Sequence, residues 1–225
     1  MRDADVRRLL KEQLDATYGA DGSTRVVEEL GLCRGTVRAD IAVVNGSLKG
    51  YEIKSDRDTL TRLAKQVDVY SKVFDTVTII VADRHLVRTE QIVPAWWGIE
   101  LVAADSRSVL KLSPVREERN NDAVEPSALV QLLWREEVLA LLNQLSLSQH
   151  LVNKPRRFLW QALTAAVTVL ELKDLVRQCL KVRAHWRSRG EQTQGDAKFL
   201  PCATWSGYPS PRFRSRSRRY TYRPS

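Results

Sequence analysis

The stretch RADIAVVNGSLKGYEIKS, residues 38–55, decides the fold of this 225-residue chain. It reads as two short apolar strands joined by an Asn45-Gly46 turn. Asp40, Glu52 and Lys54 fall inside these strands, where removing an ion from water is costly unless it gains a partner. Charges at such positions indicate either a functional site or a structural ion network between two strands.

The length of the turn decides whether these three charges share a face. A two-residue loop would set Asp40 opposite Tyr51 and send Glu52 to the other face. A three-residue loop over 45–47, with Gly46 in the left-handed conformation, sets Asp40 opposite Glu52. The second register also gathers Ile41, Val43, Tyr51 and Ile53 into one apolar surface, and we therefore predict it.

Two carboxylates close together on one face favour a cation. At about 4–5 Å they repel by roughly 3–4 kcal/mol at an effective dielectric near 20. Lys54 offsets part of this repulsion, and a divalent cation offsets more, with hard oxygen ligands selecting Mg²⁺ or Mn²⁺. We therefore favour a metal site at Asp40 and Glu52 over a purely structural Asp-Lys-Glu network.

Hydrophobic periodicity places these strands in a mixed sheet flanked by helices, an α/β fold. A helix is expected from Ser55, with Ser55 as N-cap and Asp58 three residues later. The predicted order is helix 3–17, strand 26–32, the hairpin, the helix after Ser55, strand 76–81, a short helix or loop 82–91, and strand 99–104.

The rest of the chain reads as less regular. The polar segment 105–126 is broken by prolines and predicts a linker, and apolar helices are expected over 127–145 and 158–189. Beyond 190 the composition is Arg-, Ser- and Pro-rich, which predicts a disordered basic tail. The predicted divisions are an α/β domain 1–112, a linker 113–126, a small α-helical domain 127–189 and the tail 190–225.

The net charge and the cysteine content indicate which partners and which compartment to expect. The formal net charge of +9 favours a polyanion such as nucleic acid, although the tail supplies most of the excess. A positive stripe recurs every four residues on the last helix, at Lys173, Arg177 and Lys181, and predicts either a solvated helix face or a nucleic-acid contact. Three widely spaced cysteines and apolar runs far shorter than about 20 residues predict a cytoplasmic protein without a membrane span.

The motif Asp40, then Glu52-Ile53-Lys54 at the end of the next strand, resembles the PD-(D/E)XK, or restriction-endonuclease-like, nuclease superfamily. Gln66 and Tyr70, four apart on the following helix, look like the Q-x₃-Y element of its RecB-like branch. The block over about 25–104 looks more closely like a small bacterial family within that superfamily. One departure is Ala39, where the motif has proline.

The resemblance implies a Mg²⁺- or Mn²⁺-dependent nuclease with a restriction-endonuclease-like sheet, with DNA favoured over RNA. It implies metal ligation by Asp40, Glu52, the Ile53 carbonyl and a further acid, for which we choose Glu29. Lys54 would act on the attacking water, with Gln66 and Tyr70 also at the site. The alternative is a non-catalytic nucleic-acid-binding protein with the same fold.

Several flanking residues allow two interpretations. Arg38 beside Asp40 is expected to contact phosphate or to complete the ion network, and it joins the predicted nucleic-acid contacts. His85 and Arg88 follow a strand end, where loops often line a site, but a surface histidine is the favoured interpretation. Trp96-Trp97 is expected to fill the core rather than to stack on bases.

Overall fold

The computed structural model describes residues 1–183 of the chain, and they form a mixed α/β structure. A single six-stranded sheet has the order β1-β2-β3-β4-β5-β6. Its first three strands form an antiparallel meander, β3, β4 and β5 are parallel, and β6 returns antiparallel to β5. The strands are β1 Arg25–Leu32, β2 Val37–Val44, β3 Leu48–Lys54, β4 Thr76–Ala82, β5 Gly98–Ala104 and β6 Leu110–Arg116.

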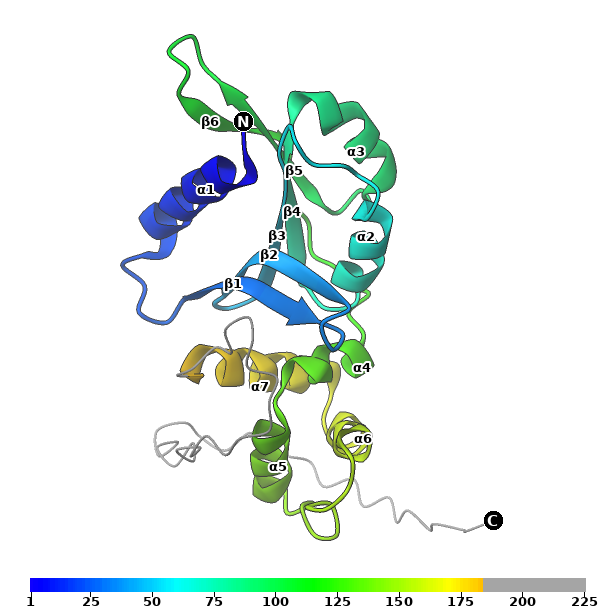
Figure 1. The fold of residues 1–225 in the computed structure, drawn as a ribbon. Helices are drawn as coiled ribbons and strands as arrows, with labels where there is room; N and C mark the ends of the chain where they lie inside the picture. The colour runs from blue at the N-terminus through cyan, green and yellow to red at the C-terminus, as the bar shows by residue number, and fades with distance from the viewer. Residues whose placement is uncertain (184–225) are drawn as a thin grey trace. The chain divides into compact units, whose positions relative to one another are not determined.

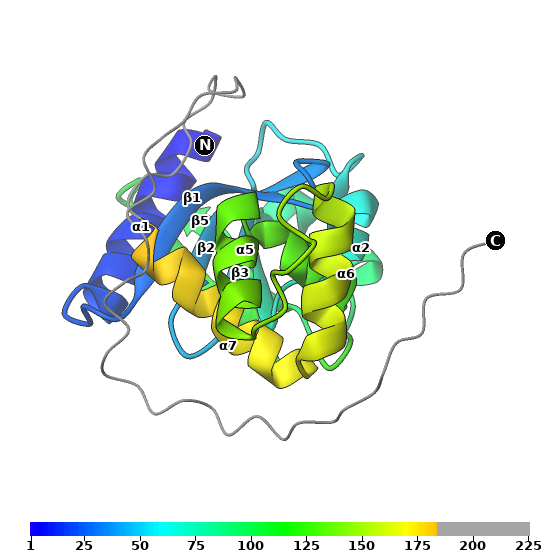
Figure 2. The same cartoon turned by 90° about the horizontal axis from the view of Figure 1, so that it is seen from below.

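Helices cover both faces of this sheet, and Figure 1 shows α1 on one side with α2 and α3 on the other. Figure 2 shows α5, α6 and α7 grouped together on one side of the strands. The described helices are α1 Asp3–Tyr18, α2 Leu63–Ser71, η1 Asp83–His85, α3 Leu86–Ile92, α4 Pro126–Leu129, η2 Val130–Leu132, α5 Arg135–Gln144, α6 Arg156–Ala166 and α7 Val169–Val182. The predicted fold class, a mixed sheet flanked by helices and followed by a helical region, is confirmed.

Two apolar clusters lie on opposite faces of the sheet. Under α1, its residues Val6, Leu10 and Leu14 pack on the alternating strand positions predicted to form one surface: Ile41, Val43, Tyr51 and Ile53. The larger cluster joins α2, the other strand face and the helices α4 to α7. The described part of the helical region therefore shares a core with the sheet, and a separate domain over 127–189 stays a prediction.

The predicted hairpin register is confirmed. Val44 pairs with Leu48 and Ile41 with Tyr51, so the continuation of this register sets Asp40 opposite Glu52. The left-handed conformation predicted for Gly46 is wrong, because Gly35 is the one described glycine with positive φ. The Asn45 side-chain oxygen accepts a hydrogen bond from the Ser47 amide at 3.0 Å, and this local turn removes the need for a left-handed glycine.

The helix after the hairpin begins later than predicted, at Leu63 rather than Ser55. The expected capping contacts do form, since the Ser55 amide and hydroxyl both donate to Asp58 Oδ2, at 2.8 and 2.6 Å. Together with the backbone hydrogen bond from the Asp58 amide to the Ser55 carbonyl, at 3.1 Å, they close a single turn. Serine and aspartate can therefore satisfy the capping pattern without an adjoining helix.

Three further element predictions differ from the structure. The segment 105–126, predicted as a linker, contains β6, whose Pro114 is tolerated because β6 is an edge strand. The helix predicted over 127–145 is interrupted by extended backbone at Leu133 and Trp134, and that over 158–189 at Val167 and Thr168. The predicted disordered tail lies outside the described residues.

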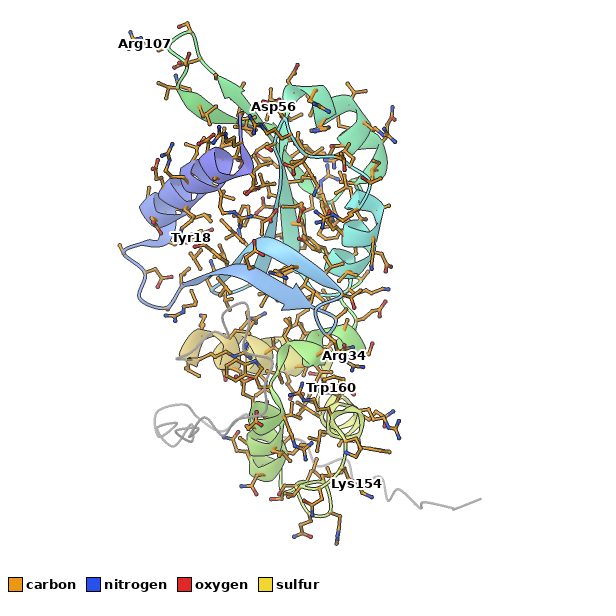
Figure 3. The ribbon with its side chains drawn as sticks, viewed as in Figure 1. Tyr18, Arg34, Asp56, Arg107, Lys154 and Trp160 are labelled. Carbon is orange, nitrogen blue, oxygen red and sulfur yellow. The ribbon has the colours of Figure 1, made fainter. Side chains whose placement is uncertain are left out.

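Figure 3 shows side chains filling the space on both sides of the sheet, with Tyr18 at the end of α1 and Arg107 in the β5–β6 turn. Trp97 is fully buried and stacks on Tyr70 with ring centroids 5.6 Å apart, whereas Trp96 is partly exposed. The prediction that these tryptophans fill the core is thus confirmed for Trp97. No helix among residues 1–183 is both long and apolar enough to cross a membrane.

Candidate functional site

Glu52 is the centre of a buried polar cluster on the α2 face of the sheet. Its side chain is 2% exposed and lies beside Lys54, which is 5% exposed. Lys54 Nζ donates to Glu52 Oε1 at 2.5 Å, and Gln66 Nε2 donates to the same oxygen at 2.5 Å. Tyr70 donates its hydroxyl hydrogen toward Glu52 Oε2. Four of the predicted site residues therefore meet at one carboxylate.

The pKa of Glu52 is raised above its ordinary value of 4.5, first by burial and then by the nearby charge of Asp40. Lys54 and the hydrogen bond from Tyr70 act in the opposite direction. The pKa of Tyr70 is also raised well above its ordinary range, by burial and by Glu52, so its hydroxyl remains a donor at neutral pH. Perturbed titration of a carboxylate by burial and a second carboxylate is typical of functional sites.

Asp40 lies where β2 separates from both neighbouring strands. β1 and β2 pair on either side of it, at Glu28–Ile41 and Leu30–Ala39, but not at Asp40 itself, and the β2–β3 pairing ends at Ile41. Asp40 Oδ2 accepts a hydrogen bond from the Ile53 amide at 2.8 Å. The carboxylate thus fills the opening between β2 and β3, near Glu52 but hydrogen-bonded within the sheet.

Glu29 lies on β1 opposite Asp40, at the interruption of the β1–β2 pairing. It has positive φ, 56°, which is uncommon for a residue other than glycine. Its carboxylate pairs with Arg7 at 3.4 Å and with Arg38 at 3.1 Å. The side chain of Arg38 is 44% exposed, so this predicted phosphate contact is accessible while remaining paired with Glu29.

The cluster offers acceptor oxygens to a cation, but it lacks a third His, Cys, Asp or Glu ligand among residues 1–183. Gln66 Oε1 is buried and has no hydrogen-bond partner within the described chain, so an acceptor is available beside Glu52. Asp40 and Glu52 are hard oxygen donors, which fits Mg²⁺ or Mn²⁺. However, no group of three or more His, Cys, Asp or Glu side chains in residues 1–183 is arranged to hold a metal ion. The fit therefore rests on these two carboxylates and on backbone or amide oxygens.

Ile53 has a different role from its neighbours on β3. Its side chain is buried in the cluster under α1, and its amide donates to Asp40. Metal ligation by its carbonyl stays a prediction.

The predicted positive stripe on α7 does not lie on a solvated face. Lys173 Nζ lies 2.8 Å from Asp75 Oδ1, and Arg177 lies 3.6 Å from Asp75 Oδ2, with both basic side chains mostly buried. Lys181, one turn further, is partly exposed. Two of these three predicted nucleic-acid contacts are thus engaged with Asp75, whose Oδ2 also accepts from the Leu48 amide at 2.7 Å.

Arg7 was expected on the outward face of the helix predicted over 3–17, and this is wrong because it reaches β2. Its NH2 group donates to Asp40 Oδ1 at 2.8 Å and its NH1 group to the Asp40 carbonyl at 2.9 Å. The signal that it faces the sheet is its spacing, three residues before the buried Leu10 and seven before the buried Leu14. His85 was expected at the surface, and this is wrong because it is buried. Arg88 is exposed. The short η1 turn directs His85 inward, where apolar periodicity gives no signal.

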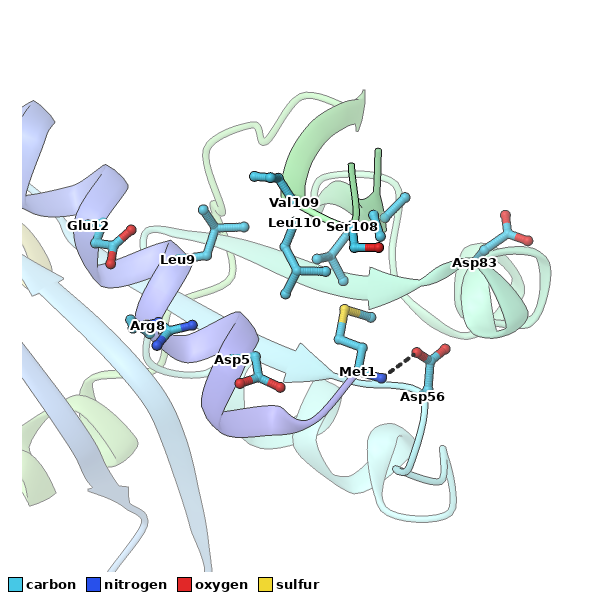
Figure 4. A pocket seen from close by; sticks show the side chains of 13 residues that line it. Met1, Asp5, Arg8, Leu9, Glu12, Asp56, Asp83, Ser108, Val109 and Leu110 are labelled. Carbon is cyan, nitrogen blue, oxygen red and sulfur yellow. Dashed lines mark ion pairs between the residues drawn. The ribbon is translucent and has the colours of Figure 1, made fainter. Parts of the chain in front are cut away.

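A separate hollow of about 820 Å³ lies between α1, the segment after β3 and the β5–β6 hairpin. Figure 4 shows Asp56 in this hollow, 3.4 Å from the Met1 amino group. Its charged lining is mostly acidic, and it shares no residue with the predicted site: Asp5, Glu12, Asp56 and Asp83 face one arginine, Arg8. Carboxylates repel phosphate, so this hollow does not extend a nucleic-acid site.

Comparisons with known proteins give the family. The family model described as "Bacteriophage P4 protein cII" matches residues 2–193, most of the chain. Protein cII of Enterobacteria phage P4 is 26% identical over 185 residues, covering 82% of this chain and 69% of the relative. No solved structure matches.

These findings overturn the resemblance drawn from the sequence. The assignment to the PD-(D/E)XK superfamily, with its small bacterial family and its RecB-like element, is wrong, because the phage family is what the chain matches. The motif D-x₁₁-E-x-K is short, and two strands and a turn suffice to produce its spacing. The chain belongs to the bacteriophage P4 protein cII family.

Proposed function

We propose that this protein is a divalent-cation-dependent phosphodiesterase that acts on nucleic acid, DNA in preference to RNA, at Asp40, Glu52 and Lys54. The observation that carries the proposal is the convergence of two carboxylates and a buried lysine where β2 parts from β3. The raised pKa of Glu52, caused by burial and by Asp40, supports a site that gains from a cation. The net charge of +9 supports a polyanionic substrate.

Each residue has a role that its contacts support. Asp40 and Glu52 would hold Mg²⁺ or Mn²⁺, which when bound polarises a phosphoryl oxygen and lowers the pKa of water. Lys54 stands beside Glu52 and would stabilise negative charge on the phosphate. Gln66 and Tyr70 fix the Glu52 carboxylate by hydrogen bonds to its two oxygens. Glu29 is the further acid at the edge of the site.

A second candidate is a non-catalytic nucleic-acid-binding protein, and one observation favours it. Both oxygens of Asp40 and both of Glu52 already accept hydrogen bonds from protein donors. A carboxylate satisfied in this way can serve as a purely structural acceptor. The cytoplasmic localisation stays a prediction.

Cleavage assays separate the two candidates. Supercoiled plasmid, single-stranded DNA and single-stranded RNA are incubated with Mg²⁺ or Mn²⁺ and with wild type, Asp40→Asn or Asp122→Asn. Asp122 is an exposed carboxylate outside the site, so its substitution is the matched control. We expect cleavage of DNA by wild type and Asp122→Asn, and a loss of at least about 100-fold in Asp40→Asn.

Cleavage that persists in Asp40→Asn would show that the activity does not depend on this site. Binding of DNA without cleavage in either metal would establish the second candidate instead.

A further inference from the structure

Arg7 places a protein cation directly on one of the two proposed metal ligands. Its NH2 group donates to Asp40 Oδ1 at 2.8 Å, while its NH1 group donates to the Asp40 carbonyl at 2.9 Å. The same guanidinium lies 3.4 Å from both Asp3 Oδ2 and Glu29 Oε1. Three carboxylates thus surround one largely buried positive charge.

The two oxygens of Asp40 differ in what holds them. Oδ2 is tied to the Ile53 amide, which is fixed in β3 by the sheet. Oδ1 is tied to Arg7, a long side chain on a different element. Of the two oxygens, Oδ1 is therefore the one that a movement of a single side chain can release.

A divalent cation and a guanidinium repel each other when they bind the same carboxylate oxygen. We infer that Arg7 is the resident cation of the site and that divalent-cation binding at Asp40 requires it to leave Oδ1, so that α1 regulates metal occupancy. This inference rests on the proposed function, because it concerns the same metal site.

The surroundings of Arg7 permit this exchange. Asp3 and Glu29 are already within ion-pair distance, so the guanidinium keeps two anionic partners after it leaves Asp40. The helix itself is anchored by Val6 and Leu10 on the apolar cluster beneath it. Only the side chain has to move, and exchange between partners costs less than exposure of a buried, unpaired charge.

Lys11, one turn further along α1, offers a matched control. It also pairs with a glutamate of β1, Glu28, at 2.5 Å, but both side chains are more than 40% exposed and neither contacts Asp40. Lys11→Gln therefore removes one positive charge from the same helix without freeing Asp40. A general electrostatic effect would appear in both variants, and a specific exchange in Arg7→Gln alone.

Titration with Mn²⁺ alone, followed by the electron paramagnetic resonance signal of free Mn²⁺, tests the inference on the full chain. Arg7→Gln is expected to bind Mn²⁺ about tenfold more tightly than wild type, which corresponds to about 1.4 kcal/mol. Lys11→Gln is expected to match wild type. In wild type, the NMR signal of the Arg7 side-chain Nε–H should shift when diamagnetic Mg²⁺ is added, because the guanidinium leaves Asp40 while the helix stays in place.

The outcomes distinguish this inference from the proposed function. Equal affinity in wild type and Arg7→Gln, with binding lost in Asp40→Asn, overturns the exchange and leaves the metal site intact. Weaker binding in Arg7→Gln also overturns it, since Arg7 would then position Asp40. If none of these proteins binds Mn²⁺, both the Arg7 exchange and the proposed metal site are overturned. If Arg7→Gln fails to fold, an unchanged Arg7 Nε–H signal in wild type at a Mg²⁺ concentration that stabilises the protein overturns the inference by itself.

Discussion

Two ion pairs buried in the described part of this chain are built differently. Arg183 meets Glu137 through two parallel hydrogen bonds, at 2.9 and 2.7 Å, and also donates to the Leu132 carbonyl. Its guanidinium lies 4.1 Å from the Trp134 ring centroid. This pair joins the end of α7 to the start of α5 as a closed structural clamp, because both charged groups face each other directly.

The Glu52–Lys54 pair is as deeply buried, but it is not closed. Asp40 lies close enough to raise the pKa of Glu52, and the neighbouring Gln66 Oε1 has no partner among residues 1–183. Burial of an ion pair is therefore not what marks a site. A second carboxylate and an unused buried acceptor distinguish this cluster from the clamp.

The largest effect is expected from breaking the clamp. Glu137→Ala removes two hydrogen bonds from the buried Arg183 guanidinium and the hydrogen bond from the Trp134 amide that caps α5. Urea denaturation should show a loss of about 3–5 kcal/mol in the free energy of unfolding. Replacing both charged residues by methionine is the control and should cost much less. Equal losses in the single and double variants would contradict the clamp.

Lys54→Met tests the Glu52–Lys54 pair by its effect on DNA cleavage. Removing the ammonium beside Glu52 should lower DNA cleavage by about 10²–10³-fold, the usual effect of losing one charge-stabilising donor. Lys111→Met removes an exposed lysine paired with Asp105 and should leave cleavage unchanged. Equal rates for the two variants would show that Lys54 is structural, like Arg183.

The pH dependence of the free energy of unfolding should report the raised pKa of Glu52. Because its folded pKa is raised, the native state binds more protons than the unfolded state, and stability falls as pH increases from 4.5 through the folded pKa. Relative to Glu52→Gln, wild type should thus lose about 1.4 kcal/mol for each unit of pKa elevation. Urea denaturation at several pH values measures this difference. A constant difference, or one that favours wild type at higher pH, would contradict the raised pKa.

The smallest effect on stability is expected from Glu29→Asn. Asparagine tolerates the left-handed backbone at φ 56° better than glutamate. The ion pairs lost to Arg7 and Arg38 are weak because the Glu29 carboxylate is half-exposed. The free energy of unfolding should change by less than about 1 kcal/mol. Mn²⁺ affinity should fall, because the site loses an acid. A large loss of stability without a change in Mn²⁺ affinity would make Glu29 a clamp residue.

Much of the fold could be predicted, because alternation of apolar residues fixes which strand face is buried. Val44 opposite Leu48 followed from the need to bury Ile41 and Tyr51 together. The start of α2 could not be predicted, because Ser55 and Asp58 satisfy each other in a single turn as well as in a helix cap. These local hydrogen bonds are compatible with either conformation of the next residues, so they do not locate the first turn of α2.

The site could be predicted only where its residues share one face of a strand or helix. Spacing places Glu52 with Lys54 on one strand face and Gln66 with Tyr70 on one helix face, and the structure brings these two pairs together. That the two pairs meet was expected only from the resemblance. Arg7 could not be found in this way, because its contact with Asp40 spans 33 residues and depends on the gap between β2 and β3. The family could not be inferred either, since a short motif on a common hairpin has too little specificity.

Stabilisation by Mg²⁺ tests most directly the claim that the Asp40–Glu52 cluster is a cation site. A cation that binds only the folded state raises the free energy of unfolding, by about 1.4 kcal/mol when its concentration is about ten times Kd. We expect Mg²⁺ to stabilise wild type and Asp122→Asn but not Asp40→Asn in urea denaturation. An identical Mg²⁺ response in wild type and Asp40→Asn, including none in either, would contradict the account.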